Sequence, residues 1–262
     1  MTIVFSDLLA SGFGSVVGFV LGLVGGGGSI LAVPFLVYGV GVASPHVAIG
    51  TGTVAVAVSA LANLVPHWRS GRVKWRCGAV FALSGVVGAL AGAELAKAVD
   101  GQRLLMLFGV LMVVVGLVML RRRGAAGDPD VHLSRATARQ LLPRLVAAGF
   151  SVGALSGFFG IGGGFLIVPG LMLATGMPLA FAIGTSLVAV SAFGAATASS
   201  YAMSGLVDWR LAAIFVLGGL VGGLGGAALG RKLSGRKALL GQIFAGVVIT
   251  VGTYVLLRGF LA

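Results

Sequence analysis

The sequence predicts an all-α polytopic membrane protein made of two inverted repeats, each with about five hydrophobic segments and a glycine-broken half-helix at its centre. Three observations predict this fold class. The composition is far more apolar than that of a soluble domain, with a mean hydropathy of +1.11, 58% hydrophobic residues and 9% charged residues. A glycine run occurs twice, and clusters of basic residues change loops between the two halves of the chain.

The two glycine runs predict helices that break within the membrane. Gly25–Ser29 leads into an apolar stretch that ends at Pro34, and Gly160–Gly164 leads into one that ends at Pro169, 135 residues further on. Each glycine inside a helix costs roughly 1 kcal/mol relative to alanine, so clustered glycines end a helix. In lipid, irregular backbone is tolerated only where protein buries it or where it lines a cavity. Close helix packing explains most of the 46 glycines, but the clustered ones need a further reason.

The first half predicts one helix before its glycine run and four segments after it. Residues 1–24 are apolar, carry Asp7 and lack a basic start, so we expect a retained membrane helix rather than a cleaved signal peptide. The segment 30–42 reaches only about 20 Å at 1.5 Å per residue, which is too short to span. We expect it to form a half-helix or a re-entrant arm. Full-length spans are expected at 46–66, 77–97 and 103–120.

The second half repeats this order and several of the same motifs. Residues 141–159 lead into the second glycine run, 165–176 form the short piece and 180–203 the following span. Two further motifs recur: Ala-Ile-Gly-Thr at 48–51 and 182–185, and a connector beginning with Ser-Gly and ending with Trp-Arg at 70–76 and 204–210. The predicted organisation is a first repeat at 1–120, a basic linker at 121–140 and a second repeat at 141–262.

The basic residues predict that the two repeats are inverted. In the first half the connector 67–76 carries four basic residues and no acid, whereas 94–103 is balanced. In the second half the pattern is exchanged, because 204–210 is balanced and 231–237 is basic. Cytoplasmic loops are enriched in Lys and Arg, so equivalent loops lie on opposite faces. The stretch 121–144 has six basic and two acidic residues, so the linker is predicted to be cytoplasmic and both termini to lie outside.

Inverted repeats with paired helix breaks indicate a secondary transporter whose site lies near the bilayer midplane. No Lys or Arg lies in the middle of a predicted span, so a small anion would be held by backbone amides at half-helix N-termini and by hydroxyls. Each hydroxyl has an alternative role in helix packing or in bonding to its own backbone. The candidate residues are Gly25, Gly26, Gly27, Gly28, Ser29, Gly50, Thr51, Thr53, Gly160, Gly162, Gly163, Gly164, Gly184, Thr185 and Ser186.

The paired glycine-run-to-Val-Pro motifs, the two Ala-Ile-Gly-Thr motifs and the length resemble the TauE/SafE sulfite exporter family. The resemblance covers both halves and nearly the whole chain. It implies a carrier that exports sulfite or a related sulfur-containing anion, inorganic or organic, across a bacterial inner membrane by alternating access. The alternatives are a transporter of another small anion or sulfonate and, in a different class, an anion channel or a structural membrane protein whose glycines only pack.

Other functions are disfavoured by the residues present. The net charge of +12 comes from basic residues in connectors and at the tail, where they attract lipid headgroups, so no nucleic-acid partner is expected. His46, His67 and His132 lack metal-ligand spacing, and we expect neither a metal nor a cofactor. No catalytic triad or paired carboxylates occur in the spans, so an enzyme is not expected. Glu94 is a weak candidate for proton coupling, and a homo-oligomer is compatible with the sequence.

Overall fold

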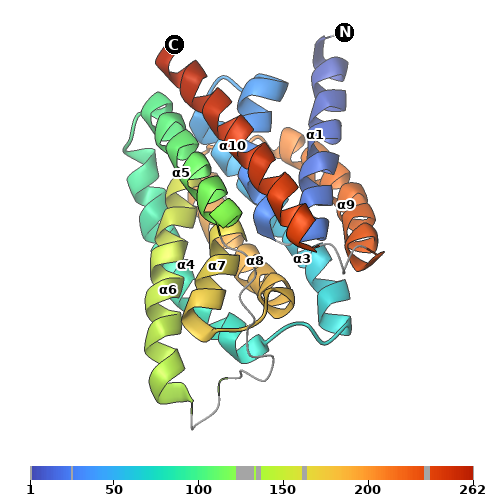
Figure 1. Cartoon of the computed structure of the whole chain (residues 1–262). Coiled ribbons are helices and arrows are strands. Elements are labelled where there is room, and N and C mark those ends of the chain that lie inside the picture. Colours follow the sequence, from blue (N-terminus) through green and yellow to red (C-terminus); the bar gives the residue numbers. More distant parts are fainter. Residues whose placement is uncertain are drawn as a thin grey trace.

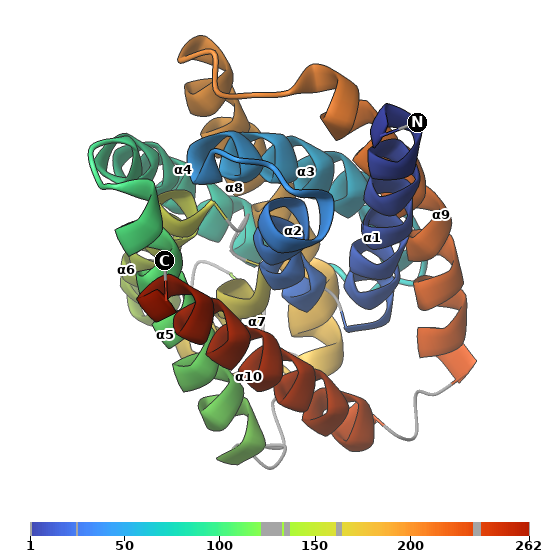
Figure 2. The same ribbon diagram turned by 90° about the horizontal axis from the view of Figure 1, so that it is seen from above.

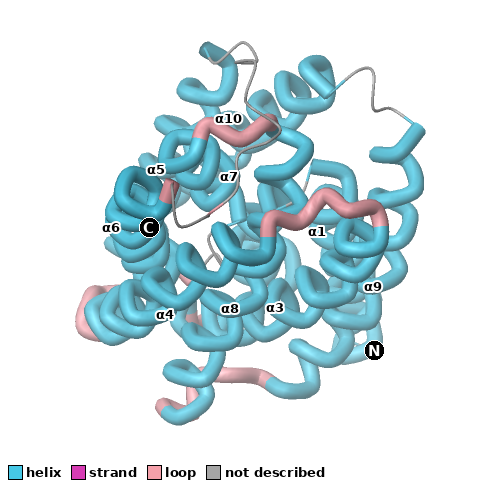
Figure 3. The backbone as a smooth tube through the Cα atoms, turned by 90° about the horizontal axis from the view of Figure 1, so that it is seen from below, coloured by secondary structure: helices cyan, strands magenta, loops and turns pink. Residues whose placement is uncertain are grey.

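The computed structural model describes residues 2–24, 26–121, 133, 137–160, 164–232 and 237–261. All regular secondary structure in these residues is helical, which confirms the predicted fold class (Figure 3). Within the described residues, six helices are long and apolar enough to cross a membrane, and shorter apolar helices accompany them. Most of the predicted linker and three candidate glycines, Gly25, Gly162 and Gly163, lie outside the described residues.

The helices follow the predicted order in both halves. In the first half they are α1 (Thr2–Val24), η1 (Gly26–Leu31), α2 (Ala32–Pro34), η2 (Phe35–Val40), α3 (Pro45–Arg69), α4 (Trp75–Lys97) and α5 (Gly101–Arg121). In the second half they are α6 (Ala138–Phe159), α7 (Gly164–Thr175), α8 (Leu179–Met203), α9 (Trp209–Lys232) and α10 (Lys237–Leu261). The short piece after each glycine run is present in both halves. In the first half it is not a uniform half-helix, because it passes from 3₁₀ through α to π geometry.

Turns at equivalent positions use the same residue type in the same conformation. Gly41 and Gly176 end the two short pieces with φ of 85° and 76°, and Gly71 and Gly205 lie in the two equivalent connectors with φ of 68° and 69°. Only glycine adopts these left-handed angles without a steric cost. The duplication read from the sequence therefore extends to backbone geometry.

Glycine stripes bring pairs of helices into close contact. A Cβ placed on Gly14, Gly18 or Gly22 of α1 would overlap the backbone of α9, and one on Gly149, Gly153 or Gly157 of α6 would overlap the backbone of α4. The close-packing explanation therefore holds for these glycines, as it does for small residues at membrane helix interfaces in general. Each pair joins one helix of the first half to one of the second.

The two halves exchange equivalent partners. In the first half α1 packs on α9 and in the second α6 packs on α4, while α3 contacts α8 and α5 contacts α10. Viewed from above, α3 and α8 lie between the α1–α9 pair and the α4–α6 pair (Figure 2). In Figure 1, α1 begins at the end of the bundle where both chain termini lie, and α6 begins at the opposite end. A two-fold axis that relates the two halves would produce this exchange, because each helix of one half would pack on the other half as its equivalent does.

Candidate functional site

The first glycine break, η1, packs against α7, the helix that follows the second break. At the first break the chain folds back on α1. A Cβ on Gly28 would lie 2.5 Å from the amide nitrogen of Leu21 and 2.7 Å from the carbonyl oxygen of Val17, so only glycine fits there. Gly26 and Gly27 belong to the same short helix, and Ser29 next to them is fully buried.

The second break begins at Gly160, which ends α6 in the left-handed conformation with φ of 63°. A side chain here would also overlap Ile49 of α3. Gly164 begins α7, is buried and opens a continuous 12-residue helix. The first amides of such a helix have no acceptor within it, and they carry the positive end of the helix dipole. The second break therefore has the helix N-terminus that the sequence predicted.

Thr53 links the first repeat to the second break. Its fully buried hydroxyl lies 3.0 Å from the carbonyl oxygen of Gly160 and 2.6 Å from that of Ile49. A hydroxyl has one proton, so Thr53 donates to one of these oxygens at a time. Thr53 thus contacts the second glycine break directly.

Thr51 and Thr185 do not lie together. Helices α3 and α8 are antiparallel: Gly50 of α3 lies beside Tyr201 of α8, and Ala57 of α3 lies beside Gly194 of α8. Thr51 of α3 therefore lies at the same height as residue 200 of α8. Thr185 precedes that level by 15 residues, which corresponds to about 20 Å along the helix axis. One small anion cannot contact both hydroxyls at once, so the candidate residues do not form a single cluster.

The Ala-Ile-Gly-Thr motif of each half instead holds the connector of the other half. The hydroxyl of Thr51 accepts a hydrogen bond from the Asp208 amide, and that of Thr185 accepts one from the Lys74 amide, both at 3.0 Å. The preceding glycines, Gly50 and Gly184, allow the same connectors to approach. Ser186 bonds back to the carbonyl oxygen of Ile183 at 2.8 Å.

Three buried hydroxyls that the sequence did not single out have no hydrogen-bond partner within the described structure. They are Ser156 Oγ, Thr197 Oγ1 and Tyr201 Oη, and all three residues are fully buried. Buried polar groups are bonded in the great majority of cases. No sequence signal distinguishes Ser156 from a packing serine, because the deciding fact is which neighbours surround it.

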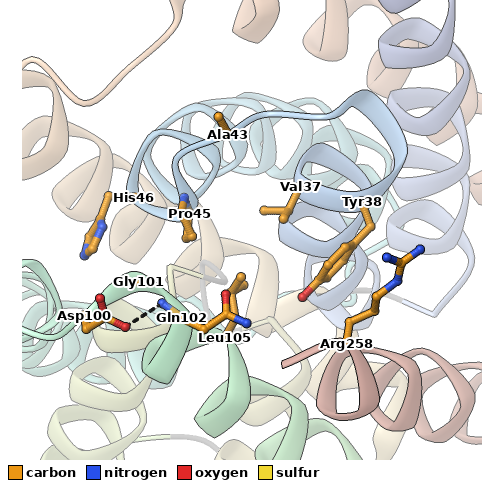
Figure 4. A pocket seen from close by; sticks show the side chains of 10 residues that line it. All are labelled: Val37, Tyr38, Ala43, Pro45, His46, Asp100, Gly101, Gln102, Leu105 and Arg258. Carbon is orange, nitrogen blue, oxygen red and sulfur yellow. Dashed lines mark hydrogen bonds between the residues drawn. The ribbon is translucent and has the colours of Figure 1, made fainter. Parts of the chain in front are cut away.

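Two cavities lie at opposite ends of the bundle. The larger, of about 690 Å³, opens between η2, the starts of α3 and α5, and the end of α10 (Figure 4). Polar side chains around it include Tyr38, His46, Gln102 and Arg258. The smaller, of about 70 Å³, lies where α1 and α3 end and is lined by His67 and Arg72, among others.

An aromatic pair joins α5 to the end of α6, just before the second break. Leu105 of α5 lines the larger cavity, and Phe108, one turn further along α5, lies 5.9 Å from the ring of Phe159. Phe159 directly precedes Gly160, and both rings are almost fully buried.

Glu94 lies at the end of α4 rather than at the breaks. Its carboxylate accepts hydrogen bonds from Lys97 at 2.6 Å and from Ser200 at 2.9 Å. The side chain is 65% exposed, so it is neither buried nor close to a glycine run.

The model of the family described as "Sulfite exporter TauE/SafE" matches residues 10–255 of the chain. The chain belongs to the TauE/SafE sulfite exporter family. It is 49% identical over 255 residues to a "Probable membrane transporter protein" of Xylella fastidiosa strain 9a5c, covering 97% of both chains. It is 28% identical over 269 residues to the "Probable membrane transporter protein YunE" of Bacillus subtilis, covering 94% of this chain and 96% of that protein. No solved structure matches the chain.

Family membership, the relatives and the apolar helices agree on a multi-pass membrane transporter. The TauE/SafE match spans both glycine breaks and both Ala-Ile-Gly-Thr motifs. Both repeats therefore belong to the family unit.

Proposed function

We propose that this TauE/SafE protein exports sulfite, or a closely related small sulfur-containing anion, by alternating access across a bacterial inner membrane. The observation that carries this proposal is the contact between η1, at the first break, and α7, which follows the second break, in a molecule whose halves exchange partners. Broken helices at a repeat interface are where secondary transporters bind their substrates. The family's name supplies the substrate class.

The proposed site lies at the second break, where α7 begins. Backbone amides at the start of α7 and hydroxyls near it hold the anion, while the first break packs against α7 and supports it. Every Lys and Arg among the described residues lies in a connector or near a helix end. The charge of the ligand is therefore balanced by helix dipoles and hydrogen bonds. Thr51 and Thr185, which hold connectors, lie outside this site.

We also propose that the repeats are inverted in the membrane, with the linker in the cytoplasm and both termini outside. The basic residues support this orientation through their change of loops. Support also comes from Figure 1, where the two termini share one end of the bundle.

Cysteine labelling tests this orientation. In a Cys77→Ala background, Ser70→Cys should react with a membrane-impermeant thiol reagent only from the cytoplasmic side, because its connector carries the basic residues of the first half. The matched position in the second repeat is the control, and Ser204→Cys should react only from outside. Both residues are exposed. The proposal fails if Ser70→Cys reacts only from outside.

The cavities favour a carrier over an open channel. The larger cavity lies at one end of the bundle and the smaller one at the other. A carrier requires saturable flux and counterflow. Purified protein in liposomes loaded with unlabelled sulfite should transiently accumulate labelled sulfite from outside, whereas linear flux without counterflow would favour a channel.

A further inference from the structure

Ser156 faces the start of α7 from the adjacent helix. Val152, one turn earlier on α6, contacts the position of Gly170 in α7, since a Cβ there would lie 3.1 Å from its side chain. Residues four apart share one helix face, so Ser156 points the same way one turn nearer the break. The short connection between α6 and α7 makes the helices antiparallel, which brings Ser156 beside the first turn of α7.

Thr197 approaches the same break from α8. The register between α3 and α8, fixed by Ala57 with Gly194 and by Gly50 with Tyr201, makes Thr197 level with Thr53. Residues 194, 197 and 201 share one face of α8, so Thr197 points toward α3. Thr53 in turn lies within hydrogen-bond distance of Gly160, where α6 ends. Helices α3, α6 and α8 therefore each direct a buried hydroxyl toward this junction.

Within the part of the chain that the structure describes, Ser156 and Thr197 stand apart from most other buried hydroxyls. Their hydroxyl oxygens have no hydrogen-bond partner in the described residues, and both side chains are 0% exposed. Other buried hydroxyls of α8, Tyr201 excepted, are bonded; Ser191, for example, donates to the carbonyl oxygen of Leu187 at 2.8 Å. A buried hydroxyl that lacks a partner next to a helix N-terminus is prepared to donate to an anion.

We propose that Ser156 and Thr197 donate hydrogen bonds to the transported oxyanion, next to the first amides of α7. This inference rests on the proposed function, and it places the donors of the site beside the second glycine break rather than at both breaks. The substrate it fits is a small oxyanion that accepts bonds on several sides from neutral donors. An SO₃ group, in sulfite or at the end of a small sulfonate, has this chemistry.

The first break lacks the equivalent donors. By the spacing of the repeats, Ser156 corresponds to Leu21 and Thr197 corresponds to Asn63. The leucine side chain offers no hydrogen bond, and Asn63 has no hydroxyl, while one N–H of its amide donates to the carbonyl oxygen of Ser59 at 2.9 Å. The six-residue η1 is also too short to present an N-terminus like that of α7.

Thermal unfolding of purified protein, with and without added anion, tests this assignment. The probes are sulfite and isethionate, and the variants are Ser156→Ala, Thr197→Val and, as the control, Ser191→Ala. Without anion, the first two should unfold at or above the wild-type temperature, because they remove an unsatisfied group. The control should unfold at a lower temperature. Anion binding raises the wild-type unfolding temperature by mass action.

The rise in unfolding temperature on adding anion then distinguishes a hydroxyl that binds the anion from one that only packs. Ser156→Ala and Thr197→Val should each need at least about tenfold more anion for the same rise, because each loses a hydrogen bond to a charged group. Ser191→Ala should respond as wild type does. If the two variants respond normally, or unfold early without anion as the control does, the assignment is wrong while the proposed function stands. If neither anion stabilises the wild type, the proposed function fails, and the assignment fails with it.

Discussion

The two glycine breaks share a sequence pattern but differ in what surrounds them. At the first, Gly28 packs directly against the backbone of α1, and the following turns change from 3₁₀ through α to π geometry. The side-chain amide of nearby Asn63 donates a hydrogen bond to the carbonyl oxygen of Ser59. At the second, a regular helix begins after Gly160, and two buried hydroxyls beside it lack partners. The two copies of a duplicated motif can therefore have different roles. We infer that the first break packs and the second binds.

The largest expected effect comes from filling the breaks. Gly28→Ala puts a methyl group into backbone atoms, and Gly160→Ala adds left-handed strain to an overlap with Ile49, so each should lower the free energy of unfolding by about 1–3 kcal/mol. Thermal unfolding in detergent measures this. Gly246→Ala, where nothing lies within 4 Å, is the control and should be neutral or slightly stabilising.

Transport separates these two variants. Folded Gly28→Ala protein should keep the wild-type half-saturation for sulfite, whereas Gly160→Ala should raise it because the shift reaches Ser156 one turn away. The opposite result, with affinity lost at Gly28 and kept at Gly160, would reverse the roles of the breaks.

An intermediate effect is expected at the bond between the repeats. Thr53→Val removes the hydroxyl that reaches Gly160, a bond with no equivalent at the first break because the matched residue is Leu187. The change should cost about 1 kcal/mol of stability and disturb the second break alone. Thr250→Val is the control, since its hydroxyl bonds only within α10. Equal unfolding temperatures for the two variants would show that the Thr53 bond does not hold the break.

Much of the fold could be predicted from the sequence, but the clustering of the site could not. The positions of the helices follow from hydropathy and from the glycine runs, because a membrane-spanning helix must be long and apolar and clustered glycines end a helix. The repeated Ala-Ile-Gly-Thr motif misled because Thr51 and Thr185 lie about 20 Å apart along the antiparallel helices α3 and α8. Both threonines are in the second turn of their helices, far from mid-depth. Ser156 depends on which face of α6 meets α7, and hydropathy carries no such information.

The smallest effect is expected at these two threonines. Thr51→Val and Thr185→Val should each cost about 0.5 kcal/mol, because each leaves a connector amide without its acceptor at a part-buried position that water can reach. The two losses should be similar, and the half-saturation for sulfite should not change in either variant. A loss of affinity without a loss of stability, in either one, would return that threonine to the binding site.

Sulfite counterflow in proteoliposomes tests the division between the breaks most directly. The two variants to compare are Ser156→Ala, at the second break, and Ser29→Ala, at the first. Both serines are fully buried in the wild-type protein. The account predicts that Ser156→Ala raises the half-saturation for sulfite about tenfold or more, while Ser29→Ala leaves it unchanged. An equal rise in both variants, or a rise in Ser29→Ala alone, would contradict it.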